Sequence, residues 1–82
     1  MYQSTITVTL RPSILDVQGK AVEHSLHTLG LTHVANVRVG KSIHLTIDVP
    51  TEEEAKRITD EACKKLLANP VMEDYTFTVS KI

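Results

Sequence analysis

Apolar and polar residues alternate along four stretches of the chain, and each such stretch predicts a β-strand. The four stretches are residues 5–10, 33–39, 42–49 and 74–79. In the first, Ile6 and Val8 share one face while threonines occupy the other. The second and third are separated only by Gly40-Lys41, which predicts a tight turn and therefore a β-hairpin.

A helix is predicted after the first strand. Asp16 is a typical N-cap, because a carboxylate accepts hydrogen bonds from the free N–H groups of the first turn. Val22, Leu26 and Leu29 then recur at helical spacing and predict a narrow buried stripe. Gly19 lies beside this stripe and would let the helix approach closely whatever it packs on.

A second helix is predicted after Pro50. Thr51 and Glu54 form a capping box at its start, and Asn69-Pro70 ends it, because the residue before a proline disfavours helical geometry. Its predicted buried positions recur at helical spacing: Ala55, Ile58, Ala62 and Leu66.

The predicted element order is β-α-β-β-α-β, which is the ferredoxin-like order of an α+β fold. We expect a single domain over residues 1–82, with one four-stranded antiparallel sheet that carries both helices on one face. The other face of the sheet is rich in threonine. Either solvent or another copy of the chain would cover it, and the sequence does not distinguish these two outcomes.

Composition narrows the possible functions. The chain has 82 residues, 41% hydrophobic and 23% charged, which is typical of a globular protein. A net charge of −1 gives no basic footprint for nucleic acid or for a membrane surface. No signal-peptide pattern is visible at the N-terminus, so a cytoplasmic location is expected. A domain this small buries only about 60% of its unfolded surface, so oligomerisation would stabilise it.

No catalytic or metal-binding constellation is predicted. His24 and His27 have a spacing that can hold a metal, but no third ligand is near in sequence. Cys63 falls in mid-helix without an activating base and is interpreted as a structural thiol. An RNA-binding sheet of the same strand order would need aromatic residues on its central strands, and these are missing.

Three strings resemble the PurS family across essentially the whole chain. Residues 15–22 read LDVQGKAV, where the family has LDPQGKAV; Val17 replaces a proline at the helix start, a change that costs little. Residues 37–41 read VRVGK, like the family's hairpin string. Residues 66–75 read LLANPVMEDY and are similar to the family's LLANPVIEDY.

The resemblance implies a non-catalytic accessory subunit of phosphoribosylformylglycinamidine (FGAM) synthase, an ATP-dependent ligase of purine biosynthesis. The complex would convert formylglycinamide ribonucleotide (FGAR), glutamine and ATP into FGAM, glutamate, ADP and phosphate. The small subunit would be a homodimer or higher homo-oligomer, in which two copies could share a sheet. It would bridge the glutaminase and the synthetase and support ammonia transfer. No cofactor is expected in this chain, and ATP and Mg are expected in the synthetase.

The residues expected to contact partners come from the matched strings: Arg38, Gly40, Lys41, Asn69, Pro70 and Glu73. Arg38 and Lys41 are the stronger candidates, since no requirement of the fold calls for a charge at either position. Two other functions stay open. The chain could be a free-standing regulatory module that binds a small ligand at a dimer interface, or a small enzyme in its own right.

Overall fold

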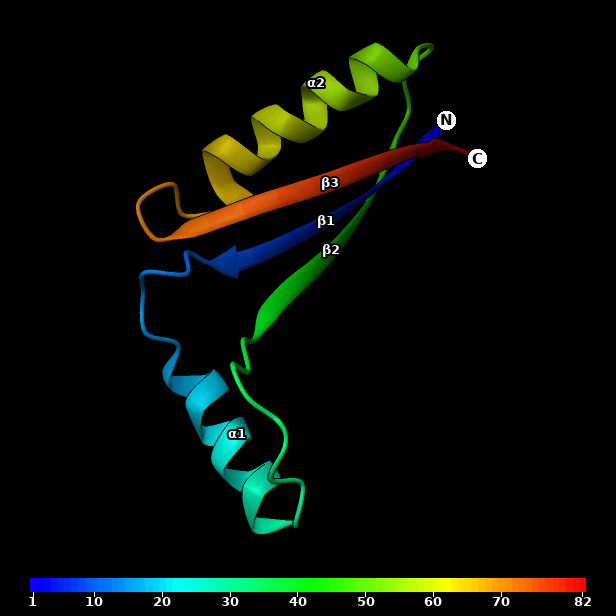
Figure 1. The fold of residues 1–82 in the computed structure, drawn as a ribbon. Helices are drawn as coiled ribbons and strands as arrows, with labels where there is room; N and C mark the ends of the chain where they lie inside the picture. Colours follow the sequence, from blue (N-terminus) through cyan, green and yellow to red (C-terminus); the bar gives the residue numbers. More distant parts are fainter.

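A computed structural model describes all 82 residues, in which three strands and two helices alternate (Figure 1). The elements are β1 (Tyr2–Leu10), α1 (Val17–Thr28), β2 (Gly40–Ile47), α2 (Glu52–Ala62), a π-helical turn η1 (Cys63–Leu67) and β3 (Glu73–Lys81). The strands form one sheet in the order β2-β1-β3, and both neighbouring pairs are antiparallel. The predicted α+β class, with an antiparallel sheet and two helices, is confirmed.

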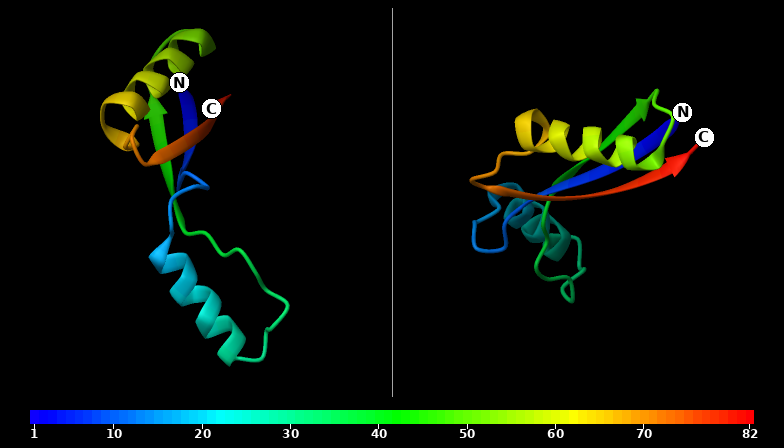
Figure 2. Two further views of the ribbon diagram at one scale, coloured as in Figure 1. Left: turned by 60° about the vertical axis from the view of Figure 1, so that its left-hand side comes forward. Right: turned by 90° about the horizontal axis from the view of Figure 1, so that it is seen from above.

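The central strand β1 follows from the alternation of its residues. Ile6 lies opposite Ile43 of β2 and Phe77 of β3, and all three point to the face that α2 covers. Ile6 and Val8 are fully buried there. Because successive side chains of a strand point to opposite faces, the threonines of β1 occupy the other face, which no element of the chain covers (Figure 2).

Helix α2 packs on the sheet through small side chains. Thr51 caps it by accepting from Glu54 N at 3.3 Å, as the capping box predicts. Thr59 Oγ1 donates to Ala55 O at 2.8 Å, so the 2.5 Å contact between Ser4 Oγ and Thr59 Oγ1 has Ser4 as its donor. These buried hydroxyls are therefore fully paired, as buried polar groups must be.

The end of α2 corrects one predicted core residue. Leu66 is 82% exposed, and its neighbour Leu67 packs on the core instead. The reason is the π-helical turn, in which Ala68 N donates to Cys63 O five residues earlier at 3.0 Å. The wider turn changes which side chains face the sheet. Cys63 is fully buried, as expected of a structural thiol, and burial raises the pKa of its thiol group.

The predicted hairpin is wrong, because residues 33–39 form no strand and β2 begins at Gly40. Gly40 and Lys41 are not a turn; they lie opposite Thr9 and Val8 in the β1–β2 ladder. A Cβ atom at Gly40 would lie 2.6 Å from Val8 O, so glycine is needed there for close approach of the two strands. The sheet consequently has three strands rather than four.

The expectation that both helices lie on one face of the sheet is also wrong. α2 covers the sheet, while α1 and the segment that returns from it project beyond the sheet end (Figures 1 and 2). We call residues 16–39 the arm and the remaining elements the sheet body. The molecule measures 50 × 27 × 14 Å, and its radius of gyration is 16.2 Å. A compact chain of this length would have a radius of about 12 Å.

The predicted buried stripe of α1 is therefore uncovered. Val22 is 38% exposed and Leu29 is 76% exposed, because no other element of the chain lies over them. The predicted close approach at Gly19 is confirmed, because α1 lies against another segment of the chain there. A Cβ atom at Gly19 would be 2.3 Å from Val37 O in the returning part of the arm.

The contact between α2 and β3 gives a testable titration. Tyr75 Oη donates to Asp60 Oδ1 at 2.5 Å, and Lys64 Nζ pairs with Asp60 Oδ2 at 2.9 Å. The hydrogen bond to Asp60, together with burial, raises the pKa of Tyr75 to about 12. The same hydrogen bond lowers the pKa of Asp60.

We expect Asp60→Asn to lower the pKa of Tyr75 toward 10, its ordinary value, because the acceptor loses its negative charge. The measurement is the tyrosinate absorbance during a pH titration in a Tyr2→Phe background, where Tyr75 is the remaining tyrosine. Asp48→Asn, at an exposed position after β2, is the matched control and should leave the titration unchanged. A Tyr75 that already ionises near 10 in the parent chain would contradict the assigned contact.

Candidate functional site

The six predicted contact residues gather at one end of the sheet, where β1 ends and β2 and β3 begin. Gly40 lies opposite Thr9, and Glu73 lies opposite Leu10, so the two groups flank the last residues of β1 from either side. Lys41 Nζ approaches Glu73 Oε2 to 3.8 Å, which joins the groups across that strand. The structure thus brings together residues that are some thirty positions apart in sequence.

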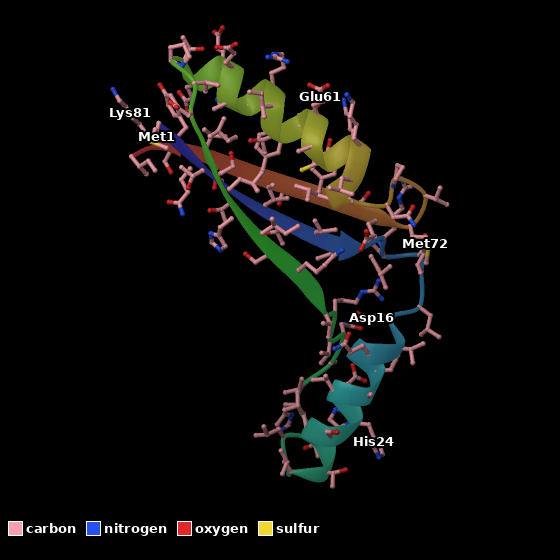
Figure 3. All side chains as sticks on the ribbon, turned by 180° about the vertical axis from the view of Figure 1, so that it is seen from behind. Met1, Asp16, His24, Glu61, Met72 and Lys81 are labelled. Carbon is pink, nitrogen blue, oxygen red and sulfur yellow. The ribbon has the colours of Figure 1, made fainter.

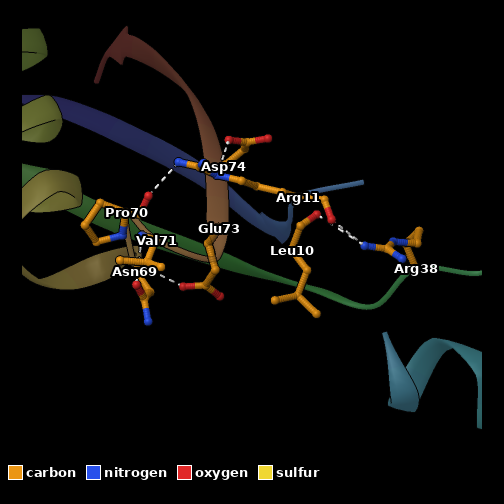
Figure 4. A network of polar contacts seen from close by, with 8 residues as sticks. All are labelled: Leu10, Arg11, Arg38, Asn69, Pro70, Val71, Glu73 and Asp74. Atoms are coloured by element: carbon orange, nitrogen blue, oxygen red, sulfur yellow. Dashed lines mark hydrogen bonds and ion pairs between the residues drawn. The ribbon is translucent and has the colours of Figure 1, made fainter. Parts of the chain in front are cut away.

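Asn69 and Glu73 close the loop that leads into β3. Glu73 Oε1 accepts from Asn69 N at 2.7 Å, and Asn69 Oδ1 accepts from Val71 N at 3.0 Å (Figure 4). Glu73 N in turn donates to Asn69 O at 2.8 Å. These residues fix the shape of the loop, and the loop holds Val71 outward with most of its side chain exposed.

Arg11 ties this loop to the end of β1, and sequence reasoning missed its role. Its Nη2 donates to Pro70 O at 2.5 Å, and its Nε lies 3.4 Å from Asp74 Oδ1. Figure 4 shows Arg11 between the Pro70 loop and Arg38. Its place directly after the apolar alternation of β1 was the available signal, but the partners of Arg11 are about sixty residues away.

Arg38 does have a structural task, contrary to the expectation that nothing in the fold requires its charge. Its Nη2 donates to Arg11 O at 2.9 Å and to Ile14 O at 2.8 Å. The guanidinium group therefore holds the loop between β1 and α1. Lys41 remains a candidate contact residue, because its side chain is largely exposed and forms only the ion pair with Glu73.

Asp16 links this end of the sheet to the arm (Figure 3). Oδ1 accepts from Gly19 N at 2.8 Å, and Oδ2 accepts from Val39 N at 2.7 Å. These two hydrogen bonds, with a smaller contribution from the charge of Arg38, hold the pKa of Asp16 below its usual range. Its capping role was predicted, whereas its contact with Val39 was not.

Two clefts adjoin at this place, and Asp16 lines both. One, of about 530 Å³, lies between the end of β1, the start of α1 and residues 36–38. The other, of about 480 Å³, lies between residues 39–41, Leu10 and Glu73. Both have mixed walls in which acidic side chains outnumber basic ones, and this does not favour a phosphate-bearing ligand.

The carboxylates around the clefts are engaged in holding the fold. Glu23 accepts from Val37 N at 3.3 Å, and this hydrogen bond lowers the pKa of Glu23. Asp16, Glu73 and Asp74 have the partners described above. A general acid that works near neutral pH needs a raised carboxyl pKa, whereas the pKa values of Asp16 and Glu23 are lowered. The arrangement suits a surface of fixed shape for contact with protein.

The structure contains no cluster of potential metal ligands and no helix that could cross a membrane. His24 and His27 are both exposed on α1, and no three histidine, cysteine or acidic side chains come close enough together to hold an ion. Neither helix has the length and apolar character that a bilayer crossing requires.

Comparisons with known proteins agree along the whole chain. A family model described as PurS, phosphoribosylformylglycinamidine (FGAM) synthase, matches residues 3–81. The chain belongs to the PurS family. The phosphoribosylformylglycinamidine synthase subunit PurS of Synechocystis is 46% identical over 99% of this chain and 81% of its own length.

Solved PurS structures share the fold, arm included. The crystal structure of Methanocaldococcus jannaschii PurS, one of the subunits of formylglycinamide ribonucleotide amidotransferase, superimposes with a TM-score of 0.90 at 38% identity, covering 100% of this chain and 99% of that one. A chain in the structure of PurLQS from Thermotoga maritima gives a TM-score of 0.89 at 34% identity, covering 96% of each. The projecting arm is thus a property of the PurS fold.

The loop at Asn69 gives a second testable prediction, which separates a hydrogen bond from an ion pair. Glu73→Gln keeps an oxygen for Asn69 N but loses the attraction to Lys41, so we expect a loss of at most about 0.5 kcal/mol of unfolding free energy. Glu73→Ala removes the acceptor as well, and we expect a loss of about 1 kcal/mol. Urea unfolding measures both.

Lys41→Ala is the matched control, because it removes the same ion pair from the other side. It should resemble Glu73→Gln. Equal losses from Glu73→Gln and Glu73→Ala would mean that the charge of Glu73, rather than its hydrogen bond, fixes the loop.

Proposed function

We propose that this chain is the small subunit of an FGAM synthase of purine biosynthesis, and that it acts without catalytic residues of its own. The single observation that carries this proposal is the match to PurS over residues 3–81, with a PurLQS chain of the same fold. The clefts at the sheet end support it, because their carboxylates stabilise the loops rather than standing free for chemistry.

The complex would convert FGAR, glutamine and ATP into FGAM, glutamate, ADP and phosphate, as a ligase does. In this proposal the chain bridges the glutaminase and synthetase subunits and supports the passage of ammonia between them. The 50 Å length of the molecule favours such a role, since it sets the arm and the far end of the sheet well apart. The surface formed by Arg38, Gly40, Lys41, Asn69, Pro70 and Glu73 is the proposed contact with a partner subunit.

ATP and Mg belong to the synthetase subunit in this proposal, and this chain binds no cofactor. The excess of acidic over basic side chains in both clefts supports that assignment, because it does not favour the phosphates of ATP. The complex would work in the cytoplasm, where nucleotide precursors are made.

We also propose that the chain is a homo-oligomer in which a second copy covers the arm. Val22 and Leu29 of the apolar stripe are exposed, and no other element of the chain lies over them. Their burial in a dimer would stabilise a small protein whose own core is limited to a few aliphatic side chains. A sheet shared between copies is one way to build that contact, because residues 34–39 belong to no helix or strand of their own chain.

The first test is the rate of FGAM formation by the cognate glutaminase and synthetase with and without this chain. We expect the rate with glutamine to depend on the chain, while the rate with free ammonia does not, because only the glutamine route needs the bridge. An equal glutamine-dependent rate without the chain would reject the subunit assignment. The free-standing module that binds a small ligand would then be the function to pursue.

The homo-oligomer is tested by Leu29→Glu, which places a charge on the uncovered stripe of α1. Since burying an unpaired charge is costly, we expect the dissociation constant of self-association to rise by at least about tenfold. Sedimentation equilibrium measures it. Leu66→Glu, at an equally exposed leucine of the sheet body, is the matched control. Unchanged association in Leu29→Glu would contradict an interface on α1.

A further inference from the structure

The arm joins the sheet body through two chain segments, and one charged side chain crosses from each segment to the other. Asp16, on the outgoing segment, accepts from Val39 N on the returning segment at 2.7 Å. Arg38, on the returning segment, donates to Arg11 O at 2.9 Å and Ile14 O at 2.8 Å on the outgoing one. Asp16 is only 4% exposed, so water competes little for its carboxylate.

The two segments also touch through their backbones. At Gly19 a Cβ atom would lie 2.3 Å from Val37 O and 2.9 Å from Asp16 Oδ2. No side chain fits this space without moving the returning segment away from α1. Glycine is therefore retained inside a helix, where it would otherwise cost up to about 1 kcal/mol relative to alanine.

Further along, the same face of α1 continues to hold the returning segment. Glu23 Oε1 accepts from Val37 N at 3.3 Å, and His27 Nε2 lies 2.7 Å from Val34 O. Because a carbonyl can only accept, the His27 ring carries its proton on Nε2. Asp16, Glu23 and His27 are spaced by seven and four residues, so they share one helix face.

No apolar core holds the arm against the sheet body, because the apolar stripe of α1 is exposed rather than packed on the sheet. The polar contacts at the junction are what define the direction of the arm. Two of the strings that resemble the PurS family, residues 15–22 and 37–41, supply both sides of this junction. Their meeting in space gives a physical reason for the Asp, Gly and Arg that they contain.

We propose that Asp16, Gly19 and Arg38 form a brace that fixes the direction in which the arm leaves the sheet body. They are positioning residues, since they present the apolar stripe of α1 to a second copy in one orientation. This inference rests on the proposed homo-oligomer. A preformed orientation strengthens association because less conformational freedom is lost on binding.

Asp16→Asn separates the brace from simple helix capping. Asparagine offers one oxygen in place of two, so it can still cap α1 at Gly19 while it turns an N–H group toward Val39 N. We expect α1 to stay helical by circular dichroism, while the amide exchange of Val39 accelerates by at least about tenfold. Asp48→Asn, the same change at an exposed position, should leave Val39 exchange unchanged.

A spectroscopic signature accompanies this variant. In the parent chain the amide resonances of Gly19 and Val39 should move together with pH as one carboxylate titrates. Both resonances should lose that titration in Asp16→Asn, because the titrating carboxylate is removed. Separate or absent titrations in the parent chain would overturn the shared contact.

Gly19→Ala should change amide exchange rates in opposite directions, depending on whether Gly19 is an ordinary helix residue or a part of the brace. If Gly19 is an ordinary helix residue, alanine should slow amide exchange in α1, because it is the better helix former. If Gly19 belongs to the brace, the Cβ atom displaces the returning segment, and exchange at Val37 and Val39 accelerates by about tenfold while self-association weakens by a similar factor. Ser25→Ala, at an exposed position on the same helix, controls for helix propensity.

Unchanged or slower exchange at Val37 and Val39 in Gly19→Ala would overturn the brace. Faster exchange with unaltered self-association would overturn its positioning role. Failure of the proposed function is seen separately, in the parent chain, as a monomer that leaves the glutamine-dependent rate unaffected.

Discussion

Three backbone groups of residues 34–39 form hydrogen bonds with side chains of α1 and its N-cap residue rather than with a neighbouring strand. Asp16 and Glu23 accept from Val39 N and Val37 N, and Val34 O pairs with His27. Because buried or partly buried backbone groups need partners, this choice decides the architecture. The segment lies along the helix, the sheet has only three strands, and the arm projects beyond the end of the sheet.

The sheet body and the arm differ in their stability against local opening. The sheet body has its own core, in which Ile6 and Val8 pack against Cys63 and Ala68, with Ser4 and Thr59 satisfying each other inside it. The arm has mostly polar contacts, and its apolar stripe is uncovered. Local opening is expected where few apolar contacts are buried, so the arm should open before the sheet body does. A second copy that buries the stripe would remove this difference, which is why the proposed oligomer matters for stability as well as for function.

The sequence predicted the sheet body well, since its signals are local. Alternation placed β1 and β3, and the capping box placed α2 within one residue of its start.

The arm was mispredicted for a physical reason. The pattern around Val37 and Val39 specifies an extended backbone, but it does not say whether the partner is a strand or the polar face of a helix. The six site residues lie in two strings that resemble the PurS family, but nothing in the sequence indicates that the two strings meet at one end of the sheet. The task of Arg38 was missed because its acceptors are backbone carbonyls, which no side-chain pattern reveals.

The proposed bridging role requires two surfaces held in a fixed relative position. One surface here is the loop around Asn69 and Glu73, whose shape is held by hydrogen bonds to the Glu73 carboxylate and the Asn69 side-chain oxygen. The other is the apolar side of α1. The only covalent links between them are residues 11–16 and 38–39, which contain no regular element. Asp16 and Arg38 cross-connect those two links in opposite directions, so a movement of either link has to break hydrogen bonds at the other. The junction is thus the one place where a single substitution can uncouple the two surfaces while leaving the core of the sheet body intact.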